Sequence, residues 1–150
     1  MAATKKIRTS IHGKRVGLGT RSGKLIVDGR EAITQDDTGL ARRVQGSPSA
    51  VNTTATLALA NFAAGIITST TAAAVSATLP TGTVMSGNFP DIGTDEAFDW
   101  VVINTGATNA FTLVASTGHT IVGAAAVAAS TSARFRTRYT GSAWVTYRIA

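Results

Sequence analysis

The chain has 150 residues, of which 14 are Lys or Arg and 8 are Asp or Glu, and its formal net charge is +6. It has no cysteine, which excludes a disulfide framework, a thiolate metal site and a cysteine nucleophile. An apolar content of 44% excludes a wholly disordered chain, and the length is that of one packed domain.

Neither a secretory signal nor a membrane span is expected. Lys5 and Lys6 are basic, but no apolar run follows them. Residues 44–90 contain no charged residue and no histidine. Hydroxyl, amide, glycine and proline residues interrupt this segment every few positions, and it lacks the run of about 18 apolar residues that a membrane helix needs. The sequence therefore predicts a soluble protein without a membrane partner.

Charge divides the chain into two regions. Residues 1–43 hold ten basic and four acidic residues, whereas residues 44–133 hold four acids and no Lys or Arg. Four arginines follow in residues 134–150. Because six glycines also lie in the basic segment, we predict a basic, Gly-rich amino-terminal arm over residues 1–47 and a body over residues 48–150.

Few bulky apolar residues occur in the arm, so by itself it cannot offset the entropy of ordering a backbone. One stretch is an exception: residues 24–33 read as a hairpin around the Asp28-Gly29 turn. We expect the remainder to be extended and to become ordered only against another surface. The alternative is a solvated, frayed terminus.

The body is predicted to be mainly β. Leu59, Phe62 and Ile66 fall at helical spacing and indicate about two turns of helix. Beyond them, short alternating segments separated by turn residues are typical of an antiparallel β-sandwich or jelly roll. The predicted strands cover residues 73–79, 98–103, 111–115, 120–122, 134–139 and 144–149.

Residues for catalysis are scarce. His12 and His119 are the only histidines, and no zinc-binding or nucleophile-elbow motif contains either of them. His119 is expected to be a solvated turn residue. The segment 17–24 resembles a phosphate-binding loop, but its glycine spacing is wrong and Leu25 replaces the required hydroxyl residue. We therefore predict no catalytic residue, no cofactor and no metal, and hence no enzyme.

Four acids cluster at Asp91, Asp95, Glu96 and Asp99. They could bind a hard cation or supply an acid/base pair, but no EF-hand spacing is present. A solvated loop, or a complement to the basic arm of a neighbouring copy, is the favoured interpretation.

Arg134, Arg136 and Arg138 alternate along one predicted strand, which would place all three on one face. Such a row could meet carboxylates or phosphates through bidentate hydrogen bonds. The alternative is a solvated outer face that protects an edge strand from aggregation. Both interpretations remain open.

The body resembles structural proteins of tailed-bacteriophage virions, in particular the cement or decoration proteins of phage heads, with head-fibre base domains as close relatives. The matching segments contain small and β-branched residues, and the resemblance spans residues 55–149. These segments are residues 63–70, 77–81, 98–106, 118–123, 134–135 and 144.

This resemblance implies a non-enzymatic β-sandwich or jelly-roll subunit that binds the outside of the major capsid protein lattice and cements neighbouring subunits. It implies a virion location on the capsid exterior after synthesis in the host cytoplasm. Because the core is rich in small residues, we also expect a homo-oligomer, with a trimer favoured over a dimer. Nucleic acid is not the expected partner.

The arm lies outside the resemblance, and its role as a capsid anchor is our inference from its length and charge. Two alternatives remain for the whole protein: a head-fibre base or receptor-binding virion protein, and a basic nucleic-acid-binding protein. The residues proposed to anchor the arm are Lys5, Lys6, Arg8, Lys14, Arg15, Arg21 and Lys24, with Arg134, Arg136 and Arg138 as a further basic contact face.

Overall fold

A computed structural model describes residues 7–11, 14–21, 24–27, 30–35, 41–42, 45–70 and 72–150, with side chains from residue 45 onward. The chain divides into two compact units, residues 1–45 and residues 46–150. We call them the amino-terminal unit and the body. The division lies two residues before the composition boundary placed at residue 47.

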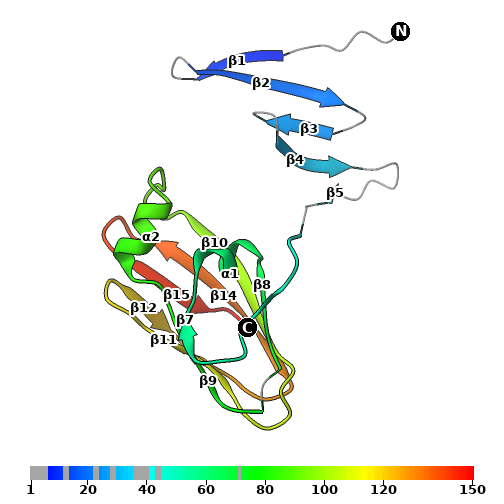
Figure 1. Cartoon of the computed structure of the whole chain (residues 1–150). Coiled ribbons are helices and arrows are strands. Elements are labelled where there is room, and N and C mark those ends of the chain that lie inside the picture. The colour runs from blue at the N-terminus through cyan, green and yellow to red at the C-terminus, as the bar shows by residue number, and fades with distance from the viewer. Residues whose placement is uncertain are drawn as a thin grey trace. The chain divides into compact units, whose positions relative to one another are not determined.

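The amino-terminal unit is an antiparallel sheet whose five strands follow one another in chain order (Figure 1). Strands β3 and β4 form the hairpin predicted over residues 24–33, with a register shift between Leu25 and Ile26. The five strands are β1 (Ile7–Ile11), β2 (Lys14–Arg21), β3 (Lys24–Val27), β4 (Arg30–Gln35) and β5 (Ala41–Arg42).

The prediction of an otherwise extended arm is wrong, because β1 pairs with β2, β2 with β3, and β4 with β5. Two residues separate β1 from β2, β2 from β3, and β3 from β4, and each of these pairs contains a glycine. Connections of this length and composition are typical of hairpins. Glycine and charge in this segment therefore indicate repeated hairpins and not an unpaired arm.

Among its described residues, the body has ten strands and two short helices. Figure 1 shows how they are arranged. In chain order they are β6 (Ser49–Ala50), β7 (Ala55–Thr56), α1 (Leu59–Ala63), β8 (Ile66–Ser69), β9 (Val75–Thr78), α2 (Gly82–Asn88), β10 (Ala97–Asn104), β11 (Phe111–Val114), β12 (His119–Val122), β13 (Ala126–Val127), β14 (Thr131–Tyr139) and β15 (Trp144–Arg148).

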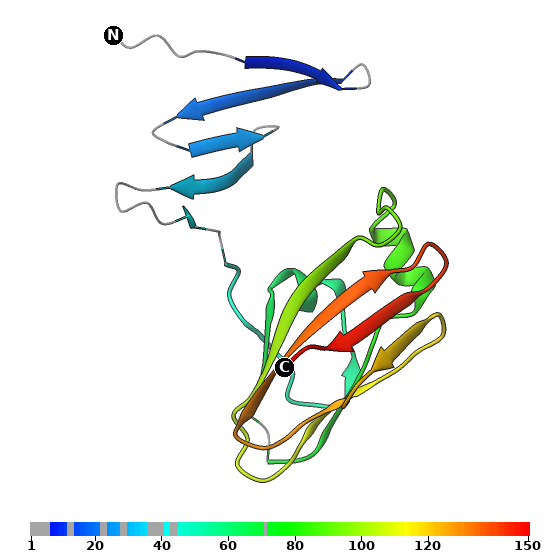
Figure 2. The same cartoon turned by 180° about the vertical axis from the view of Figure 1, so that it is seen from behind.

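Two sheets form a sandwich-like body, seen from opposite sides in Figures 1 and 2. One has the order β12-β15-β14-β10-β8-β6 and the other the order β13-β11-β9-β7. From β6 to β14, each strand lies in the opposite sheet from the strand before it. The chain therefore coils between the layers, and this makes β6, β8 and β10 parallel neighbours in one sheet and β7, β9 and β11 parallel neighbours in the other.

The mainly β class is confirmed, because strands make up most of the regular secondary structure of the described residues. The expectation of wholly antiparallel sheets is wrong, because both sheets are mixed. Turn residues mark where a strand ends, but they do not show whether the next strand pairs with it or crosses to the other layer.

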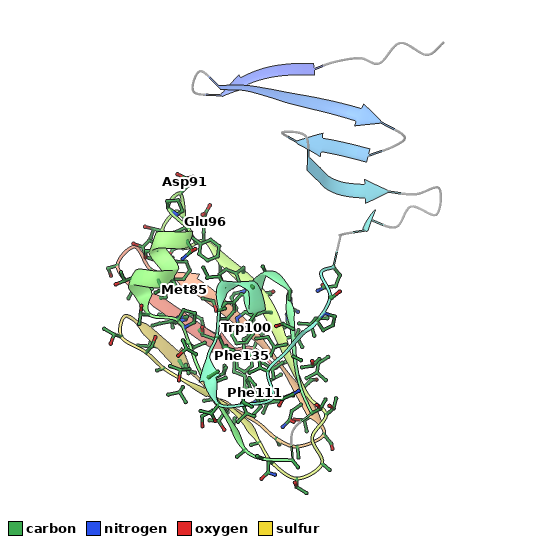
Figure 3. The ribbon with its side chains drawn as sticks, viewed as in Figure 1. Met85, Asp91, Glu96, Trp100, Phe111 and Phe135 are labelled. Carbon is green, nitrogen blue, oxygen red and sulfur yellow. The ribbon has the colours of Figure 1, made fainter. Side chains whose placement is uncertain are left out.

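The core lies between the two sheets and is centred on aromatic rings (Figure 3). Trp100 of β10 stacks on Phe135 of β14 with 4.9 Å between ring centroids. Phe62 of α1 meets the same indole edge-on at 5.0 Å. Phe111 enters from the four-stranded sheet and is equally buried. Strand alternation directs these rings inward, so α1 and both sheets share one core.

Helix α2 was not predicted, because its sequence, Gly-Thr-Val-Met-Ser-Gly-Asn, contains poor helix formers. The Thr81 hydroxyl caps it by accepting a hydrogen bond from the Val84 amide at 3.3 Å. Met85 is fully buried, and the indole N–H of Trp144 donates to the Ser86 hydroxyl at 3.0 Å. Packing against the body therefore stabilises this helix where intrinsic propensity does not.

Neither helix is long and apolar enough to cross a bilayer in the part of the chain that the structure describes.

Gly82, at the start of α2, lies against the backbone of Gly118. Its amide donates to the Thr117 carbonyl at 2.9 Å, and a Cβ added at Gly82 would lie 2.6 Å from the Gly118 carbonyl oxygen. Gly87, in the same helix, has no atom within 4 Å of an added Cβ. The two glycines therefore form a matched pair in one element.

Gly82→Ala is expected to destabilise the body by roughly 1–3 kcal/mol, because two backbone segments must separate. Gly87→Ala is expected to stabilise it by roughly 0.5–1 kcal/mol, because alanine favours a helix over glycine. Urea unfolding of both variants measures the two effects. Equal changes in both would contradict the close approach of α2 to residues 117–118.

Candidate contact surface

Arg134, Arg136 and Arg138 lie on the outer face of the six-stranded sheet, as their alternation predicted. Their inward neighbours, Phe135 and Thr137, are fully buried. The side chains of Arg134 and Arg136 are 54% and 52% exposed. The interpretation that they protect an edge strand is wrong, because β14 lies between β10 and β15.

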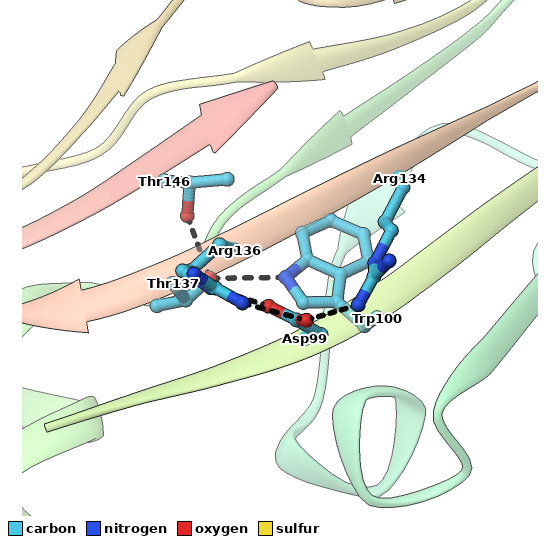
Figure 4. Close-up of polar contacts among 6 residues, drawn as sticks. All are labelled: Asp99, Trp100, Arg134, Arg136, Thr137 and Thr146. Carbon is cyan, nitrogen blue, oxygen red and sulfur yellow. Dashed lines mark hydrogen bonds and ion pairs between the residues drawn. The ribbon is translucent and has the colours of Figure 1, made fainter. Parts of the chain in front are cut away.

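Asp99 of β10 binds two of these arginines at once (Figure 4). The Nη2 atom of Arg134 donates to Asp99 Oδ2 at 2.5 Å, while Arg136 donates through Nε to Oδ1 at 2.7 Å and through Nη2 to Oδ2 at 3.0 Å. The hydrogen bond from Arg136 is the main cause that lowers the pKa of Asp99 from 3.8 to about 2, and burial partly opposes it. The carboxylate thus stays ionised well into the acid range.

Two of the four residues of the acidic cluster, Asp95 and Asp99, contact the same face. Asp95 pairs with Arg138, and this contact raises the pKa of that guanidinium. Glu96 accepts a hydrogen bond from the Gly93 amide at 2.8 Å. Asp91 and Glu96 lie at the loop tip beside α2 (Figure 3). No group of three metal-ligating side chains occurs among the described residues.

Asp95 and Asp99 therefore neutralise the arginine row of their own chain. The sequence had instead favoured a solvated loop, or a complement to the basic arm of a neighbouring copy, for the acidic cluster. Three arginines face two carboxylates, so little net charge remains on this surface. Exposed ion pairs of this kind contribute modestly to stability. The sequence indicated carboxylates as possible partners of the arginine row, but it did not indicate that Asp99 would supply one from β10, the strand beside β14.

His119 is fully buried in β12, so the expectation of a solvated turn residue is wrong. Its Nδ1 lies 2.9 Å from the Pro80 carbonyl oxygen and its Nε2 lies 2.8 Å from the Thr146 hydroxyl. Thr146 contacts the Thr137 hydroxyl at 2.8 Å, and the indole N–H of Trp100 donates to Thr137 at 3.0 Å (Figure 4). These contacts cross β12, β15, β14 and β10 in order.

Only one direction of donation satisfies every member of this series of hydrogen bonds. The Pro80 carbonyl can only accept, so Nδ1 of His119 carries the proton and Nε2 accepts from Thr146. Thr137 then donates to Thr146 and accepts from Trp100. Burial lowers the pKa of His119 from 6.5, and the Pro80 hydrogen bond opposes this shift. A neutral imidazole is therefore built into the sheet.

A shallow, open hollow of about 590 Å³ lies between α2 and the turns at residues 117–118 and 142–144. Glycine, serine and threonine residues line most of it, together with Trp144, and none of the lining side chains is titratable.

The arm residues selected from the sequence fall within one sheet. Arg8 is in β1, Lys24 is in β3, and Lys14, Arg15 and Arg21 are in β2. Lys5 and Lys6 lie outside the described residues. The sequence indicated that these residues act together, but it did not indicate the sheet that joins them.

No family model, curated protein or solved structure matches the chain.

The buried imidazole predicts a pH dependence of stability. The folded pKa of His119 lies below the unfolded value of 6.5, so the unfolded chain binds the proton more readily. The contribution of His119 to the free energy of unfolding is therefore fully present above pH 6.5. It falls as the pH drops below 6.5, by at most about 1.4 kcal/mol per pH unit.

Urea unfolding between pH 7 and pH 5 measures this effect. His119→Gln is expected to remove the decline, whereas His12→Gln, the matched control, is expected to retain it. Equal stability of the unaltered protein at pH 7 and pH 5 would contradict a buried neutral His119.

Proposed function

We propose that the chain is a non-enzymatic structural protein of a tailed-bacteriophage head, which binds the outer surface of the capsid and cements neighbouring major capsid subunits. The division of the chain into two units carries this proposal. One unit is a sandwich-like body with the motifs that resemble decoration proteins. The other is a separate sheet in the strongly basic segment of residues 1–43, which holds ten basic and four acidic residues.

Each unit suits one part of the task. The body has one hydrophobic core, and its row of three outer arginines is paired with its own acids, so the body is suited to act as a stable folded unit. The basic unit retains unbalanced charge and is suited to bind an acidic surface. Ligands that bind only the assembled shell stabilise it by mass action, and many copies on a lattice add avidity. A homo-oligomer, with a trimer favoured, would increase that avidity further.

Co-sedimentation with DNA-free, expanded heads that lack this protein tests the function. We expect saturable binding at a fixed ratio to the major capsid protein, unchanged by nuclease. Absence of binding would overturn the proposal in favour of a fibre or receptor-binding role. Binding that nuclease abolishes would favour the nucleic-acid-binding alternative.

Deletion of residues 1–43 is expected to leave the body folded but to abolish attachment to heads, because the deletion removes the basic unit. A thermal unfolding transition shows whether the body remains folded, and head occupancy is measured in the same co-sedimentation assay. Full occupancy by the truncated protein would show that the body, and not the amino-terminal unit, is the anchor.

A further inference from the structure

The register of the amino-terminal sheet separates its basic residues from most of its apolar ones. Residues directly opposite each other in a sheet share a face, and successive residues along a strand alternate between faces. Ile7 is opposite Leu18, which is opposite Val27, so these three form one apolar row. Arg8 is opposite Gly17 in the next row and falls on the other face.

Following these rows through all five strands assigns the described residues to two faces. Seven bulky apolar residues fall on one face, and Lys14 and Arg30 join them at strand ends: Ile7, Ile11, Val16, Leu18, Leu25, Val27 and Ile33. The other face, which we call the basic face, holds Arg8, Arg15, Arg21, Lys24 and Arg42. Glu31 is the one acid placed on the basic face among the described residues.

One row of the basic face concentrates positive charge. Arg21 is opposite Lys24, Lys24 is opposite Thr34, and Thr34 is opposite Arg42. Three of the four positions in this row are therefore cationic, and neighbouring strands are only about 4.8 Å apart. Like charges directly opposite each other destabilise a sheet. An anionic partner would attract all three cations and offset the repulsion between them.

We propose that the basic face binds a carboxylate-rich protein surface, which under the proposed function is the exterior of the capsid shell. Four of its five cations are arginines, whose planar groups bind carboxylates through paired hydrogen bonds. Gly17 and Gly19 share this face and, having no side chain, allow close approach of the partner.

Two observations favour a protein over a nucleic acid. The first Phe, Tyr or Trp of the chain is Phe62, so this unit lacks the side chains on which the bases of single strands most often stack. Glu31 lies in a row of the basic face together with Gly19 and Ile26, and it requires a cation in the partner, which a phosphate backbone does not supply. A carboxylate surface with interspersed cations accommodates such a mixed row.

Arginines on opposite faces provide a matched test. Arg15→Glu reverses a charge on the basic face, whereas Arg30→Glu makes the same change on the other face. In binding of the full chain to DNA-free heads, Arg15→Glu is expected to weaken affinity roughly tenfold and Arg30→Glu less than about twofold. Equal losses in the two variants would overturn the assignment of the binding face.

A third variant separates binding from folding. Arg21→Glu places an acid opposite Lys24, so the unit is expected to keep or raise its thermal unfolding midpoint while its affinity for heads falls roughly tenfold. Full retention of binding would overturn the proposal. A lowered midpoint together with lost binding would also overturn it, because the register would then be incorrect.

The outcomes distinguish this proposal from the function on which it rests. If the unaltered chain does not bind heads, the proposed function fails. If the unaltered chain and all three variants bind equally, the function stands and the basic face is overturned. If nuclease abolishes binding of the unaltered chain, the partner is nucleic acid and a carboxylate surface is overturned.

Discussion

The alternation of residues along a β-strand is the physical constraint on which both units depend. In the body it directs Trp100 and Phe135 into the core and leaves Asp99 and Arg136 outside, where the same pair of strands lets them meet. A shift of register by one residue would bury the charges and expose the rings. In the amino-terminal sheet, the same alternation assigns most of the basic and most of the apolar residues to different faces. One geometric rule thus gives the body a neutralised surface and gives the smaller unit a charged one.

Register in the body is further fixed by the buried polar chain that starts at Trp100 and ends at Pro80. Each member has a partner, and among the described residues no buried side-chain nitrogen or oxygen lacks a hydrogen bond. Such chains are costly when broken, because an unsatisfied polar group in a core loses its hydration without compensation. This series of buried hydrogen bonds therefore favours one register of β12, β15, β14 and β10 over registers shifted by one or more residues. A neutral His119 is the condition for that alignment.

Features that depend on local alternation could be predicted from the sequence. The strands around Trp100, Phe135 and Trp144, the helix at residues 59–63 and the shared face of the arginine row all follow from spacing. Features that depend on pairing between distant segments could not be predicted. The crossing of successive strands between sheets, the partnership of Asp99 with Arg134 and the burial of His119 each require knowing which strand lies beside which. Helix α2 was missed for a related reason, since contacts made by Met85 and Ser86 with the body compensate for a weak helical sequence.

The two units together suggest how a small protein could serve as a cement. Under the proposed function, a body whose arginine row is paired with its own acids resists association with unrelated surfaces, while the basic face directs attachment to an acidic one. The most direct test is electron cryomicroscopy of DNA-free heads saturated with the protein. We predict added density on the outer surface at regularly repeated lattice positions, with the amino-terminal sheet against the shell and its basic face turned toward acidic capsid residues. Density confined to the interior of the head, or an amino-terminal sheet directed away from the shell, would contradict it.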